Sequence, residues 1–172
     1  MKHDYTCTDG NITLYPLSES DSELYRQLRN QEQNRNCFLF SGIITEEAQR
    51  QWYADYLEKP NDYMFSIYNQ KGQFLGGAAL YDIAETSAEF GRIIIDKTAA
   101  CKKGIGCQVL LLLCRFARDQ FHLQSLHLEV FEDNLPAVKT YEKAGFQKQE
   151  SYPSSDSNRN LVYMEKNLEA IL

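Results

Sequence analysis

The sequence contains no apolar run that approaches the roughly 18 residues needed to cross a bilayer. Its first residues, MKHDYTCTDG, lack the apolar core of a signal peptide. No internal repeat or low-complexity run interrupts the 172 residues, and a chain of this length can bury a full hydrophobic core. We therefore expect a single domain over residues 1–172, located in the cytoplasm, that does not bind a membrane.

Positive charge is also scarce in this chain. It carries 18 Lys and Arg against 24 Asp and Glu, a formal net charge of −6, and its basic clusters are short. A protein that binds nucleic acid is expected to present a basic patch. The composition therefore argues against nucleic acid as the main partner.

Cysteine is present, but it follows none of the usual patterns. The count is odd, and neither a CxxC pair nor a His/Cys spacing typical of zinc sites occurs. The five residues are Cys7, Cys37, Cys101, Cys107 and Cys114. We expect no disulfide framework and no metal site, and reduced thiols fit a cytoplasmic protein.

The chain does contain a regular succession of strand and helix patterns. Alternating apolar residues and β formers predict strands at 11–17, 62–69, 73–83, 86–97, 124–130 and 160–168, with PSSDSNR (153–159) as the turn between two late strands. Helical spacing and end signals predict helices at 18–32, 45–59, 104–122 and 134–146, whereas 34–43 shows no clear period. The predicted order is β-α-α-β-β-β-α-β-α-β-β, an α+β or mixed-sheet domain whose three middle strands form an antiparallel meander.

The segment ACKKGIGCQVL (100–110) places two glycines at the start of an apolar helix, where glycine is unfavourable. A glycine turn before a helix leaves backbone N–H groups unpaired, and these groups can hold a phosphate together with the helix dipole. Lys102 and Lys103 add positive charge there. Alternatively, Gly104 and Gly106 only let the helix pack close to the sheet. Neither GxGxxG nor a P-loop occurs, so the common nucleotide-binding loops are not supported.

The strand FGRIIID followed by CKKGIGCQVLLLLCRFA resembles the acetyl-CoA signature of GNAT superfamily N-acetyltransferases. The later stretch LHLEVFEDNLPAVKTYEKAGF is similar to the second motif of that family. The resemblance is close over 86–146, and the element order extends it over nearly the whole chain. It implies a mixed, mostly antiparallel central sheet flanked by helices, with acetyl-CoA as cofactor and direct acetyl transfer to a primary amine in a ternary complex. Cys101 stands where the family has Arg or Gln, and Lys102 or Lys103 would replace that charge.

The same resemblance implies the cofactor-binding residues. The backbone of 93–95 would pair with the pantetheine arm as an added strand would, and the glycine loop would hold the pyrophosphate. The expected residues are Ile93, Ile94, Ile95, Cys101, Lys102, Lys103, Gly104, Ile105, Gly106, Cys107, Asn134, Ala137 and Lys143. Asn134 has a plainer alternative role as the N-cap of the following helix.

Two residues are candidates for proton transfer. Tyr141 occupies the position that the resemblance assigns to the general acid for the leaving thiolate, and its phenol has a proton to give. The alternative is a core tyrosine that shares a helix face with Val138. Glu89 lies on the strand before the glycine loop, where by the same resemblance related enzymes carry a carboxylate that takes the amine proton directly or through water. Half-burial would raise its pKa, which suits a base. The alternative is a solvent-facing glutamate.

The acceptor is the feature that the sequence determines least. The stretch 29–52 resembles bacterial members that acetylate nucleotide-linked amino sugars or protein N-termini. Candidates to stack on a uracil or sugar are Phe38, Phe40, Trp52 and Tyr81, and candidates to bind a diphosphate are Arg29 and Arg35. For each of them the alternative is an ordinary packing or surface role. Carboxylates available for a polyamine or aminoglycoside are Glu46, Glu47, Asp82 and Glu85. We expect the acceptor to be a small-molecule amine, and an amino sugar before the others. A polyamine, an aminoglycoside or a protein N-terminus stays open as the acceptor. A non-catalytic acetyl-CoA-binding module stays open as the function, and a homodimer as the assembly.

Overall fold

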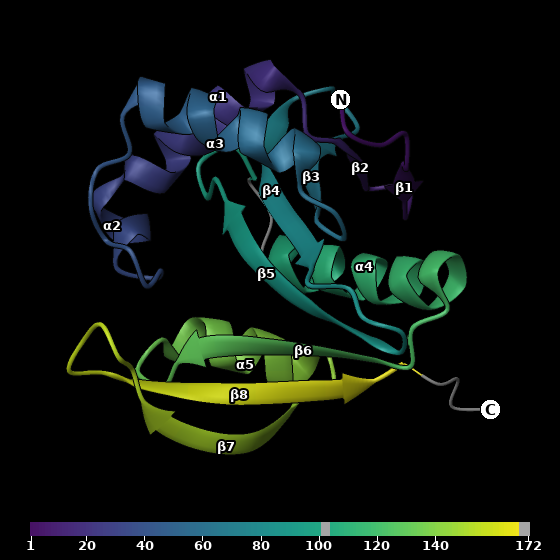
Figure 1. Ribbon diagram of the computed structural model, residues 1–172. Helices are drawn as coiled ribbons and strands as arrows, with labels where there is room; N and C mark the ends of the chain where they lie inside the picture. The colour runs from purple at the N-terminus through teal and green to yellow at the C-terminus, as the bar shows by residue number, and fades with distance from the viewer. Residues whose placement is uncertain (101–103, 169–172) are drawn as a thin grey trace.

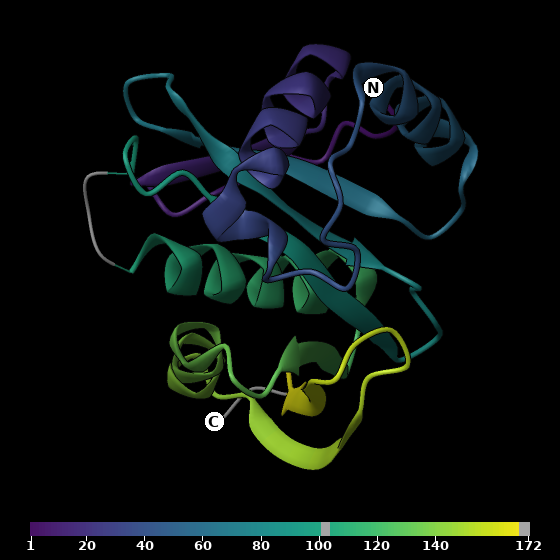
Figure 2. The same cartoon turned by 90° about the vertical axis from the view of Figure 1, so that its left-hand side faces the viewer.

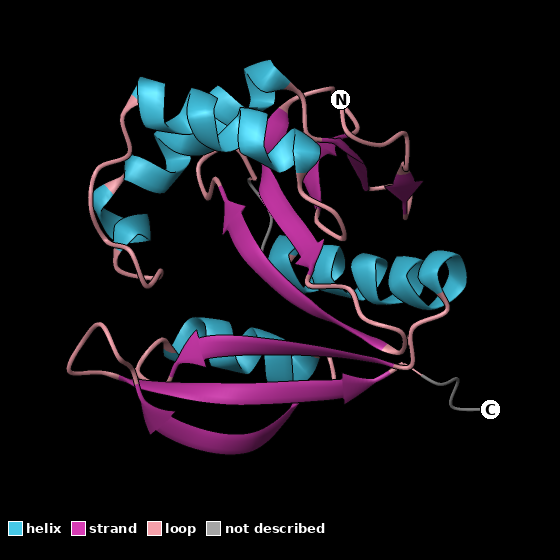
Figure 3. Ribbon diagram, viewed as in Figure 1, coloured by secondary structure: helices cyan, strands magenta, loops and turns pink. Residues whose placement is uncertain are grey.

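The computed structural model describes residues 1–100 and 104–168, and these residues form one sheet of eight strands with helices on both faces. The strands are β1 (Cys7–Thr8), β2 (Ile12–Pro16), β3 (Tyr63–Asn69), β4 (Phe74–Tyr81), β5 (Ser87–Ile95), β6 (Ser125–Phe131), β7 (Gln147–Pro153) and β8 (Asn160–Asn167). Their order across the sheet is β1-β2-β3-β4-β5-β6-β8-β7 (Figures 1 and 3). Neighbours are antiparallel except β5 and β6, which are parallel. The predicted α+β class, the mostly antiparallel sheet and the β3–β5 meander are thus confirmed.

The helices are α1 (Glu19–Asn30), α2 (Glu32–Arg35), α3 (Glu46–Glu58), α4 (Ile105–Phe121) and α5 (Leu135–Lys143). Three of them begin at side-chain caps: Ser18, Thr45 and Asn134 each accept a hydrogen bond from a backbone N–H of the first turn. The N-cap of α4 is Gly104, which is also the first residue of the predicted helix 104–122. No helix within 1–100 and 104–168 is long and apolar enough to span a membrane.

Two elements were not predicted. β1 has only two residues, too few for a periodic signal, and exists because Cys7 pairs with Leu14 across the sheet. The predicted helix 18–32 ends earlier, because Gln31 is extended with ψ of 136°, and a separate turn of helix, α2, follows. A tertiary contact stabilises this turn: the Asn34 side chain donates to the Leu28 carbonyl at 2.8 Å. Neither contact is visible in a local pattern.

The sheet is the middle of three layers. α1 and α3 cover one face, and α4 covers the other (Figures 1 and 2). The strand β3 shows the reason, because Phe65 and Ile67 belong to the core cluster with α4 whereas Met64 packs with α1 and α3. On α4, Val109 and Leu113 are fully buried against the sheet. This packing fixes the beginning of α4 relative to the end of β5.

The sheet splits between β5 and β6. These strands pair only where Ser87–Glu89 meets Ser125–His127, and then they diverge, as Figure 1 shows on its left side. β4 continues beside β5, and β8 continues beside β6, so each half of the sheet stays intact. The divergence opens the central sheet at one end.

Candidate active site

A cleft of about 490 Å³ lies at the divergence of β5 and β6. The main lining segments are 89–95 of β5, 129–131 of β6, Gly106 of α4, residues of 134–141 at α5, and 37–40 after α2, and residues of α1, α2, β4 and β8 together with Lys97 complete the lining. Segments far apart in the sequence therefore meet along one groove, and most of the residues expected from the sequence to bind cofactor or transfer protons lie in it or beside it.

The glycine loop is open rather than tightly packed. Gly104 is left-handed with φ of 92°, and a Cβ there would meet nothing within 4 Å. A Cβ on Gly106 would approach only Thr140 Cγ2, at 3.9 Å. Close packing on the sheet therefore does not explain Gly106, whose missing side chain leaves space at the cleft beside the first turn of α4, where a helix presents N–H groups that its own backbone does not pair.

This arrangement fits a pyrophosphate, since it combines the N–H groups of a helix N-terminus, the positive end of a 17-residue helix and unfilled space. Cys101, Lys102 and Lys103 lie outside the described residues. Lys97, which the sequence analysis did not single out, lines the same cleft and brings a positive charge to it. It lies two residues beyond the end of β5 and at the end of the predicted strand 86–97.

The wall formed by β5 contains a bulge. Gly91 pairs with Ala79 and Ile94 with Gly77, so Arg92 and Ile93 together stand opposite one residue, and Arg92 has φ of 53°. Within the described part of the chain, β6 pairs with β5 only as far as Glu89. The backbone of 93–95 therefore follows the cleft with one edge free of a strand partner, as a paired cofactor arm would require.

Tyr141 is both a core residue and a cleft residue. Its side chain is 8% exposed, its ring lies edge-on to Phe90 with centroids 6.2 Å apart, and it lines the cleft. Burial raises the pKa of Tyr141 to about 12, and nearby Cys37 contributes to the rise. Its hydroxyl has no hydrogen-bond partner among the described residues, so it keeps its proton at neutral pH and is available as a donor.

The other expected cofactor residues differ in position. Asn134 and Ala137 line the cleft, and the Asn134 side chain also caps α5 by accepting from the Ala137 N–H at 3.4 Å. The Ile105 side chain is buried in the core, and the Cys107 side chain packs against the same core. These two residues can therefore offer a cofactor their backbone and not their side chains. Lys143 lies exposed on the last turn of α5 and is not among the cleft-lining residues.

Glu89 is half-buried in the cleft wall, as the sequence predicts. The hydroxyl of Tyr81 donates a hydrogen bond to Glu89 Oε1 at 2.7 Å. Burial is the largest influence and raises the pKa of Glu89, while the bond from Tyr81 opposes the rise. The arrangement provides a carboxylate whose pKa lies above the ordinary value of a glutamate, which suits a proton acceptor.

Beyond Glu89 the sheet presents an acidic face, formed by Glu89, Glu129, Glu150 and Glu165 with the tyrosines Tyr152 and Tyr163. Cross-strand pairing sets it, because Glu129 and Glu150 both stand opposite Tyr163. Glu129 lines the cleft and accepts a hydrogen bond from Tyr152, so the acidic face continues from the cleft. Apart from Glu89, the sequence analysis missed these residues, although the alternation in SLHLEV places Glu129 on the polar side of its strand.

The residues expected to hold a nucleotide sugar are only partly gathered at one site. Phe38, Phe40 and Tyr81 line the cleft, whereas Trp52 stacks on Tyr56 with centroids 5.4 Å apart, outside it. Arg29 also lines the cleft, but it is buried and its guanidinium lies 3.8 Å from the Phe38 ring centroid. Arg35 is on α2 and is not among the cleft-lining residues. The expected pair of diphosphate-binding arginines is therefore not supported.

Four carboxylates were expected to suit a cationic acceptor, and their positions differ. Glu46 and Glu47 begin α3, and Glu46 lies 3.8 Å from Arg26. Asp82 and Glu85 are exposed in the turn after β4, and the charge of Asp82 contributes to the raised pKa of Glu89. No group of three His, Cys, Asp or Glu side chains in the described chain is arranged to hold a metal ion.

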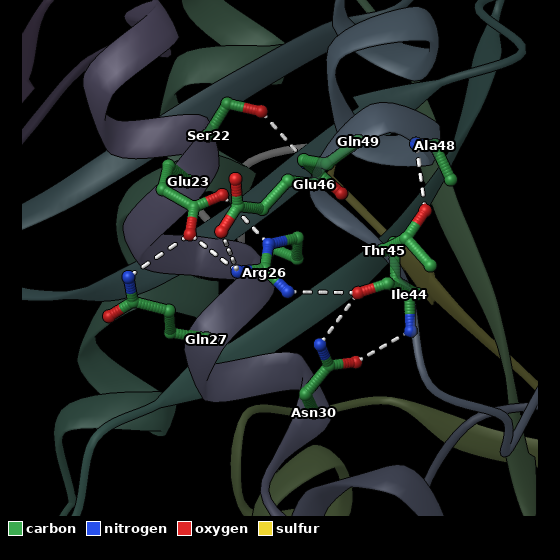
Figure 4. Close-up of polar contacts among 10 residues, drawn as sticks. All are labelled: Ser22, Glu23, Arg26, Gln27, Asn30, Ile44, Thr45, Glu46, Ala48 and Gln49. Atoms are coloured by element: carbon green, nitrogen blue, oxygen red, sulfur yellow. Dashed lines mark hydrogen bonds and ion pairs between the residues drawn. The ribbon is translucent and has the colours of Figure 1, made fainter.

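The cleft wall at 37–40 belongs to a loop that is fixed at both ends. Arg26 and Asn30 of α1 donate to the Ile44 carbonyl at 2.9 and 2.8 Å, and Ile44 N–H donates back to Asn30 at 2.8 Å (Figure 4). At the other end, Arg159 donates to the Asn36 carbonyl at 2.6 Å. These bonds hold Phe38 and Phe40 over the cleft without regular secondary structure.

Comparisons with known proteins agree with this geometry. The sequence model of an acetyltransferase (GNAT) domain matches residues 11–147. The SPbeta prophage-derived uncharacterized N-acetyltransferase YokL of Bacillus subtilis is 23% identical over 83% of this chain and 79% of its own. The probable N-acetyltransferase YjcK of the same organism is 29% identical over 80% of this chain and 81% of its own. A spermidine N-acetyltransferase from Vibrio cholerae, solved with CoA and spermine, shares the fold with a TM-score of 0.85 at 19% identity, over 93% of this chain and 97% of that one.

Proposed function

The chain belongs to the GNAT family of acetyl-CoA-dependent N-acetyltransferases, and we propose that its acceptor is a primary amine of a small molecule carrying more than one positive charge. The observation that carries the proposal is the acidic face, which continues outward from the cleft wall. Glu89 and Glu129 line the cleft itself. Glu150 and Glu165 extend the negative charge along β7 and β8.

The chemistry of the acidic face suits an extended polyamine or an aminoglycoside. Ammonium groups bind carboxylates, and tyrosine rings between the carboxylates can contact a cation through their π faces. Burial raises the pKa of Tyr163 most, and the charges of Glu165, Glu89, Glu129 and Glu150 add to the rise. The fold shared with an enzyme named spermidine N-acetyltransferase supports the same acceptor class.

The cofactor residues follow from the cleft. Bound acetyl-CoA supplies an acetyl group activated as a thioester. The N–H groups at the start of α4 and Lys97 would hold its pyrophosphate, and the free backbone edge of 93–95 would hold its pantetheine arm. Asn134 and Ala137 of α5 stand on the other side of the same groove.

Two side chains of this chain would move protons. An amine attacks only when neutral, so Glu89 would accept the proton of the acceptor ammonium at its carboxylate. Tyr141 would hold, at its Oη, the proton that the departing sulfur takes up. Because Glu89 must be ionised to act, activity rises as pH rises through its pKa, and burial places that limb above the ordinary range of a glutamate.

A thiol-release assay with acetyl-CoA tests this proposal. The panel contains spermidine, spermine, an aminoglycoside, a UDP-amino sugar and peptides with free N-termini. We expect turnover on the multiply charged amines, a higher KM for them in Glu129→Gln, and no change in Glu47→Gln, whose side chain lies on α3 away from the cleft. Turnover confined to UDP-amino sugars or peptides would contradict the proposed acceptor.

The catalytic roles are tested separately from the acceptor. We expect Tyr141→Phe to lower kcat by about 10²- to 10⁴-fold while the Kd of acetyl-CoA, measured by calorimetry, stays the same. Binding of acetyl-CoA without turnover on any amine of the panel would instead indicate a non-catalytic module. Unchanged kcat in Tyr141→Phe would remove Tyr141 from the mechanism.

A further inference from the structure

Tyr81 and Glu89 face each other across two strands. They are direct partners in the antiparallel pairing of β4 with β5, so their side chains leave the same face of the sheet. Burial and the negative charge of Glu89 raise the pKa of Tyr81, so its hydroxyl stays protonated and donates to Glu89 Oε1 at 2.7 Å. One carboxylate oxygen is thus held by the protein, and the other has no hydrogen-bond partner within the described residues.

Gly91 provides the space for this bond. A Cβ at Gly91 would lie 2.5 Å from the Tyr81 hydroxyl oxygen and 3.0 Å from its Cε1, closer than real contacts allow. Gly91 is not among the positive-φ glycines, so the backbone does not require glycine here. The missing side chain is explained by the phenol of Tyr81, which lies across β5 to reach Glu89.

Arg92 covers the ring of Tyr81 from the other side. Its guanidinium lies 4.3 Å from the Tyr81 ring centroid and donates to both oxygens of Asp62, at 2.6 and 2.9 Å. The Asp62 side chain is only 2% exposed. In a regular strand Arg92 would point to the face opposite Gly91, but the bulge and the left-handed φ of 53° turn it toward Tyr81.

The surrounding helices hold this strained residue in place. The hydroxyl of Tyr25 on α1 donates to the Arg92 carbonyl at 2.8 Å, and the Trp52 ring of α3 lies 5.9 Å from its guanidinium. Lys59 Nζ lies 3.2 Å from Asp62. Non-glycine residues in left-handed conformation persist where their surroundings over-determine them, and they cluster at functional sites. This series of contacts ends at the cleft, on Glu89.

We propose that Tyr81 is a positioning residue for Glu89 and that the Arg92–Asp62 pair fixes Tyr81, so that the free carboxylate oxygen of Glu89 is aimed at the acceptor amine. The proposal rests on the proposed role of Glu89 as the base. The bond from Tyr81 favours the charged carboxylate, which burial disfavours. Without it, Glu89 would be protonated over more of the working pH range.

Charged groups from several elements act on Glu89 together with Tyr81. Asp82 after β4 and Glu129 on β6 raise the pKa of Glu89, and His127, its partner on β6, lowers it. The titratable and charged neighbours are Tyr81, Asp82, Arg92, His127, Glu129, Tyr152 and Tyr163. A test must therefore change Tyr81 or its support and leave these charges in place.

The substitution Tyr81→Phe leaves the neighbouring charges in place, because it removes one hydroxyl and keeps the ring under Arg92. Two readouts are measured: the acid limb of kcat/KM against pH, and the titration of the Glu89 carboxyl by NMR in the protein without cofactor, assigned with Glu89→Gln. We expect both to shift to higher pH, with kcat/KM on the acid side falling about tenfold and activity at high pH largely kept. Gly91→Ala, which displaces the phenol, and Asp62→Asn, which releases Arg92, should shift both in the same direction.

Tyr68→Phe is the matched control. Tyr68 on β3 donates to Asp21 at 2.7 Å, another half-buried tyrosine–carboxylate bond, and it does not line the cleft. Its loss should lower the melting temperature and leave both pH readouts unmoved. If neither readout moves in Tyr81→Phe and Gly91→Ala, the positioning role is wrong. If the NMR titration shifts but Glu89→Gln keeps full activity, the positioning stands and the proposed base is wrong.

Discussion

Replacing Gly106 by alanine separates a glycine that serves a ligand from one that serves the fold. Gly106 is the second residue of α4, and its φ is not positive. Because the new methyl would meet only Thr140 Cγ2 at 3.9 Å, an ordinary contact distance, the fold loses nothing. Alanine is favoured over glycine in helices, so we expect a gain of about 0.5 kcal/mol in the free energy of unfolding. For a chain of this size the melting temperature would rise by about 1–2 °C.

Cofactor binding should respond in the opposite direction. The methyl would occupy space at the cleft, at the N-terminus of α4. Forcing an extra methyl into a close contact costs about 1–3 kcal/mol, which corresponds to a roughly 5- to 150-fold higher Kd for acetyl-CoA. Scanning calorimetry of the free protein and titration calorimetry with acetyl-CoA measure the two effects independently.

Gly104→Ala is the companion variant, because there the backbone and not the space requires glycine. Its φ of 92° would cost alanine about 1–2 kcal/mol, and the melting temperature should fall by about 2–8 °C. The two substitutions in one loop are thus expected to change stability with opposite signs. A lower melting temperature for Gly106→Ala, or an unchanged Kd, would show that the space at Gly106 is not a cofactor site.

Three further outcomes follow from the same geometry. Gly76→Ala should destabilise the fold by more than about 2 kcal/mol in urea unfolding, because its Cβ would lie 1.9 Å from the Ile94 carbonyl oxygen; a smaller loss would mean that β5 can move away from β4. Asn30→Ala should cost about 1–3 kcal/mol through its two bonds to Ile44, and an unchanged urea midpoint would show that this end of the loop needs no anchor. The KM of a multiply charged acceptor should rise with salt from about 0.05 to 0.5 M, and less so in Glu129→Gln; a salt-independent KM would argue against the acidic face.

The parts of the fold that the sequence predicts are those set by local physics. α4 has a continuous apolar face, and Thr45 and Asn134 are caps whose bonds close within one turn. The glycine loop belongs to the same class, since it requires only a strand, a left-handed residue and a helix in succession. Such features depend on neighbours within a few positions, which the sequence displays directly.

The acceptor side depends on contacts between distant residues. Asp62 and Arg92 are 30 positions apart, and the acidic face combines strands whose order in the sheet, β6-β8-β7, differs from their order in the chain. Alternation shows that Glu129 lies on the polar side of its strand, but only pairing and register place it opposite Tyr163, with Glu150 on the other side of that tyrosine. Arg29 shows the converse, because a residue with a charge suited to a diphosphate is buried against Phe38.

The bulge in β5 joins the two halves of the site. Before it, Glu89 is still paired within the sheet and faces Tyr81; after it, the backbone of 93–95 borders the cleft with an edge that β6 no longer covers. The pairing with β6 ends at Glu89, so the free edge begins before the bulge and continues past it. One continuous strand therefore carries the proposed base and the cofactor wall, and the bulge adds one residue between them. The residue in that bulge, Arg92, also covers the ring of Tyr81, so the contacts that fix Tyr81 lie between the two halves of the site.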